Sequence, residues 1–108
     1  MAKAGEKAIV VLTSVGTPAE AERIAHHLVE RRLAACVSLV PRIRSIYRWE
    51  GEVQDDAEVL MISKTLAGRF EALAACIREL HSYDVPEIVA LPAAAVERAY
   101  AAWLRDSV

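Results

Sequence analysis

The sequence of 108 residues lacks several features that would assign it to a specialised class of protein. It has only two cysteines, Cys36 and Cys76, and they stand far apart without a CxxC or zinc-ligand spacing. No apolar run approaches the roughly 20 residues that span a bilayer, and the start of the chain lacks the apolar core of a signal peptide. The net charge of -2 gives no electrostatic reason to bind nucleic acid or an anionic membrane. We therefore expect a reduced, cytoplasmic protein with neither nucleic acid nor membrane as a partner.

What the sequence does contain is typical of one folded domain. Hydrophobic residues make up 55% of the chain, above the roughly 45–50% that is usual in soluble domains. There is no internal repeat, linker or low-complexity segment. We predict a flexible extension over residues 1–7 and a single domain over residues 8–108.

Local patterns predict four strands and three helices. We expect strands at 8–12, at 35–49 with a bend or bulge at Pro41, at 53–64 and at 87–91. A turn at 50–52 joins the middle two strands into a long hairpin. The helices are expected after Thr17, over 70–80, and over about 94–105, where one side presents Val96, Tyr100, Trp103 and Leu104.

The first helix has the clearest start signal in the chain. Thr17 suits the N-cap, Pro18 suits the first turn, and Glu20 is placed to complete a capping box. The order of elements is then β-α-β-β-α-β with an added C-terminal helix. This order predicts an α+β fold, the ferredoxin-like sandwich with a mainly antiparallel sheet and two helices on one face.

The strands are apolar on both faces, although a sheet with one solvated face normally alternates apolar and polar residues. Residues 9–12, 59–62 and 88–91 are apolar at every position. Two helices cover only one face, so we expect another copy of the chain to cover the other, because leaving it in water costs several kcal/mol at roughly 25 cal/mol per Å². An internal strand swap, or a helix packed over the face, is the alternative.

Four segments resemble the CutA divalent-cation tolerance family and occur in the family's order and spacing. They are LVERRLAACVSLVPRIRSIYRWEGEVQDDAEVLMISKT at 28–65, RFEAL at 69–73, HSYDVPEIVALP at 81–92 and YAAWL at 100–104. The resemblance implies a ferredoxin-like subunit in a homotrimer like the PII nitrogen-signalling proteins. It also implies a role in copper and other divalent-metal tolerance without an established enzymatic reaction.

The resemblance also identifies candidate metal ligands. Family members assigned a copper site have a cysteine at the end of the first strand and two consecutive histidines before the tyrosine of HSYDVPE. This chain has Thr13 at the first place and Leu80 followed by His81 at the second. His81 and Glu87 remain as an imidazole and a carboxylate for a weakly bound divalent ion such as Cu(II). Alternatively, His81 stabilises the end of the second helix and Glu87 lies at a strand end.

Other candidates have a structural alternative of the same kind. The resemblance places the hairpin and HSYDVPE near subunit boundaries. We predict a small-ligand or interface cleft there from Tyr47, Trp49, Lys64 and Tyr83, with Glu87, or else packing between subunits. His26 and His27 point about 100° apart on a helix, which favours a solvated face over a chelate. Cys36 and Cys76 are soft ligands or, more simply, packed thiols.

Three classes of function follow, and the sequence favours the first. The first is a non-enzymatic trimeric protein that binds ions or small ligands, or a PII-like regulatory scaffold that binds no metal. The second is an enzyme of the acylphosphatase type, but SVGTPAE has one glycine and no basic residue to cradle phosphate. The third is an RNA-binding module, which needs exposed aromatic residues that the central strands lack. We expect no organic cofactor.

Overall fold

A computed structural model describes residues 3–108, and Met1 and Ala2 of the predicted extension lie outside the described residues. Within that extension, Ala4–Glu6 form a 3-10 turn, η1. It lies against a second turn, η2 (Ala67–Arg69), and the N–H of Ala67 donates to the carbonyl of Lys7 over 2.8 Å.

The elements follow the predicted order and build one four-stranded antiparallel sheet. They are β1 (Ala8–Val15), α1 (Pro18–Glu30), β2 (Cys36–Trp49), β3 (Glu52–Leu66), α2 (Phe70–Leu80), β4 (Val89–Pro92) and α3 (Arg98–Ser107). The strand order is β2-β3-β1-β4, so the hairpin forms one edge of the sheet and β4 the other. The α+β class is confirmed.

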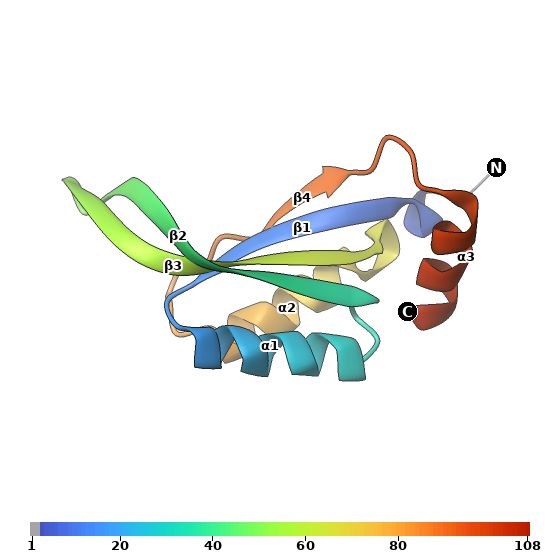
Figure 1. Ribbon diagram of the computed structural model, residues 1–108, viewed down its shortest axis with the longest axis horizontal. Coiled ribbons are helices and arrows are strands. Elements are labelled where there is room, and N and C mark those ends of the chain that lie inside the picture. The colour runs from blue at the N-terminus through green and yellow to red at the C-terminus, as the bar shows by residue number, and fades with distance from the viewer. Residues whose placement is uncertain (1–2) are drawn as a thin grey trace.

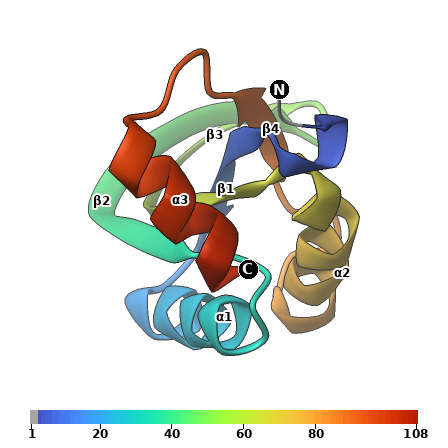
Figure 2. The same cartoon turned by 90° about the vertical axis from the view of Figure 1, so that its right-hand side faces the viewer.

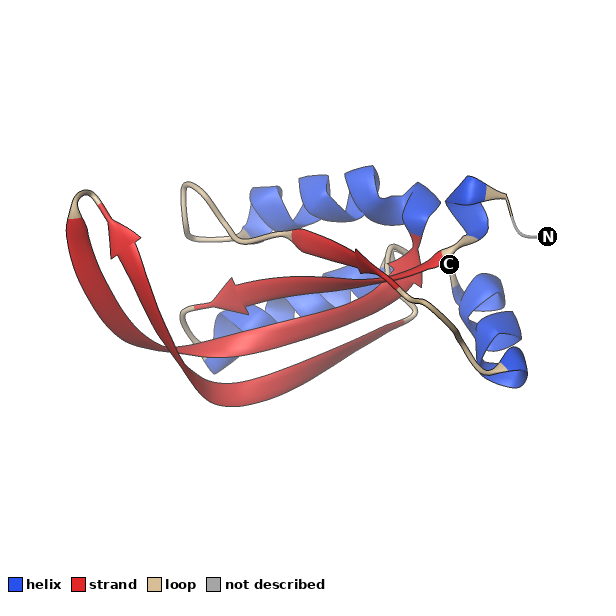
Figure 3. Ribbon diagram, turned by 90° about the horizontal axis from the view of Figure 1, so that it is seen from above, coloured by secondary structure: helices blue, strands red, loops and turns tan. Residues whose placement is uncertain are grey.

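The predicted hairpin and its bulge are both present. The register of β2 against β3 shifts between Val40 and Ile43, where Pro41 offers no N–H and Arg42 has a φ of 60°. At the tip, Glu50 and Gly51 both have positive φ, as a tight hairpin turn requires. The hairpin runs past the ends of the helices (Figure 3), and the molecule measures 46 × 25 × 22 Å.

Helices α1 and α2 lie together on one face of the sheet, while α3 lies across its end (Figures 1 and 2). The core is between this face and the two helices, and its fully buried members include Val11, Met61, Ile24, Leu28 and Ile77. The alternate residues of the strands point the other way, to a surface we call the open face. Its apolar members are Val10, Leu12, Val40, Leu60, Ile62, Val89 and Leu91.

The predicted start of α1 is half right. Thr17 accepts a hydrogen bond from the N–H of Glu20 over 3.2 Å, as an N-cap does. The capping box is wrong, because the Glu20 carboxylate instead accepts from both the N–H and the hydroxyl of Ser82, each over 3.1 Å. Through these two hydrogen bonds the Glu20 side chain binds the loop after α2.

Two boundaries near the C-terminus also differ from the prediction. Helix α3 begins at Arg98 and not near Ala94, because the Glu97 carboxylate accepts from the N–H groups of Ala99 and Tyr100. Strand β4 begins at Val89 and not at Glu87, since its pairing with β1 covers only Val89–Pro92. On α3, Leu104 is buried but Trp103 is 46% exposed, so the predicted apolar side is only partly covered.

No helix among residues 3–108 is both long and apolar enough to cross a bilayer.

Candidate functional site

A cleft of about 700 Å³ separates the hairpin from the loop that follows α2. From the hairpin it is lined by Ser45, Ile46, Tyr47, Trp49 and Glu58. From the loop it is lined by Ser82, Tyr83, Asp84, Val85 and Glu87. Its size is within the range of small-molecule sites in proteins, which is roughly 300–1,000 Å³.

The structure brings most of the predicted cleft residues together. Tyr47, Trp49, Tyr83 and Glu87 all line this cleft. Lys64 does not, because its Nζ atom lies on the open face, 3.3 Å from the Ser38 hydroxyl and 3.8 Å from the Cys36 sulfur. His81 is also absent from the lining, although its neighbour Ser82 belongs to it.

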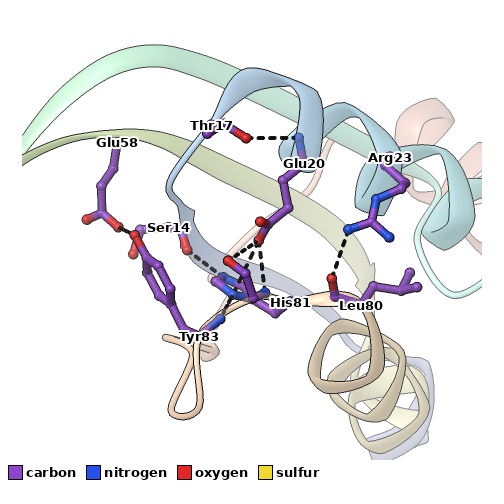
Figure 4. Close-up of polar contacts among 9 residues, drawn as sticks. Ser14, Thr17, Glu20, Arg23, Glu58, Leu80, His81 and Tyr83 are labelled. Atoms are coloured by element: carbon purple, nitrogen blue, oxygen red, sulfur yellow. Dashed lines mark hydrogen bonds and ion pairs between the residues drawn. The ribbon is translucent and has the colours of Figure 1, made fainter.

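His81 is a buried hub between α2, β1 and the loop (Figure 4). Its Nδ1 atom accepts a hydrogen bond from the N–H of Tyr83 over 3.0 Å, so Nδ1 carries no proton. The proton of the neutral ring is therefore on Nε2, which donates to the carbonyl of Ser14 over 2.8 Å. Both ring nitrogens are thus bound to main-chain groups, and His81 fixes the position of the loop.

Glu20 supports the same joint from the N-terminal end of α1. Its carboxylate holds the loop through the two hydrogen bonds from Ser82. Its Oε2 atom also lies 3.5 Å from Nδ1 of His81, but an unprotonated Nδ1 has no hydrogen to donate to it. On the other side, Arg23 donates to the carbonyl of Leu80 at the end of α2 over 3.1 Å. These contacts hold the segment HSYDVPE as a structural joint between α2 and β4.

Tyr83 connects this joint to the cleft through Glu58, a residue that the sequence did not single out. Its hydroxyl donates to Oε2 of Glu58 over 2.8 Å, and Glu58 is only 6% exposed. Burial, followed by this hydrogen bond, raises the pKa of Tyr83 well above its ordinary value. The signal for Glu58 was available: by alternation it shares a strand face with Leu60 and Ile62, where an acid is out of place.

Tyr47 has a similar partner on the hairpin itself. Its hydroxyl donates to the carboxylate of Asp56 on the neighbouring strand. This hydrogen bond raises the pKa of the Tyr47 hydroxyl above its ordinary value. Two of the three aromatic walls of the cleft are therefore neutral tyrosines tied to carboxylates, and the third is Trp49.

The predicted metal ligands do not form a site within one chain. Among residues 3–108, no three His, Cys, Asp or Glu side chains come together as a metal site. The nitrogens of His81 are engaged, and Glu87 is exposed on the cleft. Thr13, at the place of the family's cysteine, is 1% exposed on the face that the helices cover. The residues present therefore do not fit a resident divalent ion, and its binding by His81 and Glu87 stays a prediction.

Comparisons with known proteins identify the family. The family model of the CutA1 divalent ion tolerance protein matches residues 9–107. The chain is 51% identical over 98 residues to the divalent-cation tolerance protein CutA of Thermus thermophilus, a match that covers 91% of this chain and 95% of that protein.

The rice relatives agree with this assignment. The chain is 43% identical over 99 residues to the chloroplastic protein CutA 1 of Oryza sativa. This match covers 92% of this chain and 56% of that protein. The chain therefore spans about half the length of that plant relative. The crystal structure of CutA1 from Oryza sativa superimposes with a TM-score of 0.92 at 41% identity and covers 97% of this chain and 96% of that one. The chain belongs to the CutA1 divalent ion tolerance family.

Proposed function

We propose that this protein acts in divalent-cation tolerance as a non-enzymatic homotrimer of ferredoxin-like, PII-like subunits that binds small ligands between the hairpin and the loop after α2. The matching family model and the Thermus thermophilus relative are named for divalent-ion tolerance and not for an enzymatic reaction. The strand order and the two helices on one face agree with the ferredoxin-like description. The number three comes from the resemblance to the family.

The apolar open face is the main observation that supports an oligomer. Along β1, β3 and β4 it presents neighbouring apolar side chains, with Leu12 next to Ile62 on one side and Val89 on the other. Val89 and Leu91 are each 48% exposed in the single chain. A continuous apolar surface of this kind is typical of an interface, and further copies of the chain cover it economically.

The hairpin supports the same arrangement. It extends past the helices, so its tip has little of its own chain to pack against (Figure 3). Near the tip, Ile46 is 66% exposed and Val53 is 65% exposed, while Trp49 is 47% exposed. Large apolar groups at the end of a projecting hairpin are suited to contact a neighbouring subunit.

Both ring nitrogens of His81 have main-chain partners, so a metal held by His81 has no part in this function. Cu(II) tolerance then acts through other ligands, or through a partner that responds to the state of the trimer. Two free thiols, one on the open face and one buried on α2, support the proposal of a reducing, cytoplasmic location.

The acylphosphatase alternative needs an open anion-binding loop after β1. In this chain Tyr83 covers that loop, because a Cβ atom added at Gly16 would lie 3.2 Å from the Tyr83 hydroxyl. The observation supports a loop that serves as a contact between elements, and it adds to the lack of a basic residue there.

The proposal is tested by the mass of the folded protein in solution. Light scattering coupled to gel filtration should give three times the chain mass of 11.8 kDa at micromolar concentration. Native mass spectrometry with and without divalent ions then reports the stoichiometry and the bound mass together. A stable monomer would contradict the covering of the open face by other copies.

A further inference from the structure

The cleft between the hairpin and the loop is acidic without a compensating cation. Three of its lining residues, Glu58, Asp84 and Glu87, carry carboxylates. Among the described residues that line it, none is Lys, Arg or His. Tyr83 gives Glu58 a neutral donor, so this contact does not offset the charge of a carboxylate.

The arginines of the hairpin are turned away from the cleft. Side chains alternate along a strand, so Arg44 and Arg48 lie on the face of β2 opposite to Tyr47 and Trp49. Arg44 makes a two-pronged contact with Asp55, and Arg48 donates to the carbonyl of Gly51. The cations nearest in sequence therefore have their own partners.

The walls of the cleft are aromatic, and within the single chain their side chains are partly exposed. Tyr47, Trp49 and Tyr83 are 39%, 47% and 40% exposed, respectively. The face of an aromatic ring attracts a cation, and the attraction grows when the cation is removed from water. Aromatic walls beside carboxylates are the combination that recognises an ammonium group on an apolar body, whereas a hydrated metal ion makes no use of such walls.

We propose that this cleft binds a small organic cation, a primary or quaternary ammonium compound with an apolar body. Glu58 provides the buried counter-charge, the three aromatic residues enclose the apolar part, and Asp84 and Glu87 add negative potential at the exposed side. This inference deepens the proposed function, because it names the class of ligand for the same cleft.

The test is calorimetric titration of the full chain with benzylammonium chloride and with benzyl alcohol, a neutral molecule of nearly the same shape. Benzylammonium should bind at least tenfold more tightly than benzyl alcohol. Equal affinity for both, or no binding of benzylammonium, would overturn the proposal. So would displacement of bound benzylammonium by an equimolar divalent ion, which would make the cleft a metal site.

Three variants with the same change of charge show where the cation binds. Glu58→Gln and Asp84→Asn remove a carboxylate from the cleft, and each should weaken benzylammonium binding, by tenfold or more for the buried Glu58. Asp84 is exposed, so its variant keeps the test valid if Glu58→Gln does not fold. Asp55→Asn is the matched control on the other face of the hairpin, and it should stay within twofold of the parent. An effect of Asp55→Asn equal to that of the cleft variants would overturn the proposal.

Light scattering on the same samples separates this inference from the proposed trimer. A trimer that does not bind benzylammonium overturns the ligand alone. A monomer that binds it, with the expected loss in Glu58→Gln, overturns the trimer alone and upholds the cleft.

Discussion

The hydroxyl of Tyr83 donates a hydrogen bond of 2.8 Å to Oε2 of Glu58, and this contact ties the loop after α2 to the hairpin. Glu58 is 6% exposed, so water cannot easily replace the donor. A buried acceptor left without its partner costs about 1–3 kcal/mol. Tyr83→Phe should lower the free energy of unfolding by about this amount, measured by urea denaturation at one fixed protein concentration.

The control for this change is Tyr100→Phe on α3, which removes the same hydroxyl from a partly exposed tyrosine outside the cleft. We expect it to change the unfolding free energy by less than about 0.5 kcal/mol, as surface substitutions usually do. Equal effects of the two variants would mean that the Tyr83–Glu58 bond contributes no specific stability.

The same bond predicts a loss of stability at alkaline pH. The pKa of Tyr83 is raised in the folded protein, chiefly by burial and then by Glu58. An unfolded tyrosine ionises near pH ~10, so above that pH the unfolded chain releases a proton that the folded chain retains. The stability that the raised pKa of Tyr83 contributes is therefore fully present below pH ~10, and it is lost as the pH rises further. Thermal melts from pH 8 to pH 11 should show a shallower decline in Tyr83→Phe than in the parent, and parallel curves would contradict the raised pKa.

The elements that were predicted well depend on residues close together in the sequence. Thr17 and Pro18 mark the start of α1 within one turn, and Glu50 with Gly51 marks the hairpin tip. The start of α3 was missed for a local reason. Its cap is Glu97, and glutamate is not among the residues strongly preferred at that position.

The candidate site was harder to predict because its contacts are long-range. Glu20 was assigned to its own helix, yet its partner Ser82 is 62 positions away. Likewise Tyr83 and Glu58 are 25 positions apart and meet only because the loop folds against the hairpin. The aromatic residues of the cleft were predicted through the family resemblance. Lys64 does not line the cleft of the single chain, where its partners are Cys36 and Ser38, and its place in a cleft between subunits stays a prediction.

Trp49 should contribute to the contact between subunits. Truncation of a buried aromatic residue at an interface commonly costs about 2–4 kcal/mol. Trp49→Ala should therefore lower the melting temperature and make the oligomer dissociate on dilution, as measured by analytical ultracentrifugation. Trp103→Ala is the matched control, because Trp103 on α3 is 46% exposed and Trp49 is 47% exposed. If Trp49→Ala sediments and melts like the parent, the hairpin tip is a free surface.

His81 provides a direct test of whether the family's metal chemistry applies to this chain. Its two ring nitrogens are bound to the N–H of Tyr83 and the carbonyl of Ser14, so the ring has no lone pair free for an ion. We expect His81→Ala to leave Cu(II) binding unchanged in calorimetric titrations. The unfolding free energy of His81→Ala should be lower than that of the parent by about 1–3 kcal/mol, because two main-chain groups lose their hydrogen-bond partner. His26→Ala, on the exposed side of α1, is the control for non-specific imidazole binding. Titrations at pH 7.5 and pH 5.5 reveal any imidazole ligand, since protons compete with the metal for the ring. If His81→Ala folds but loses Cu(II) binding, while His26→Ala keeps it, then His81 is a ligand. The loop would then have to open before the metal binds.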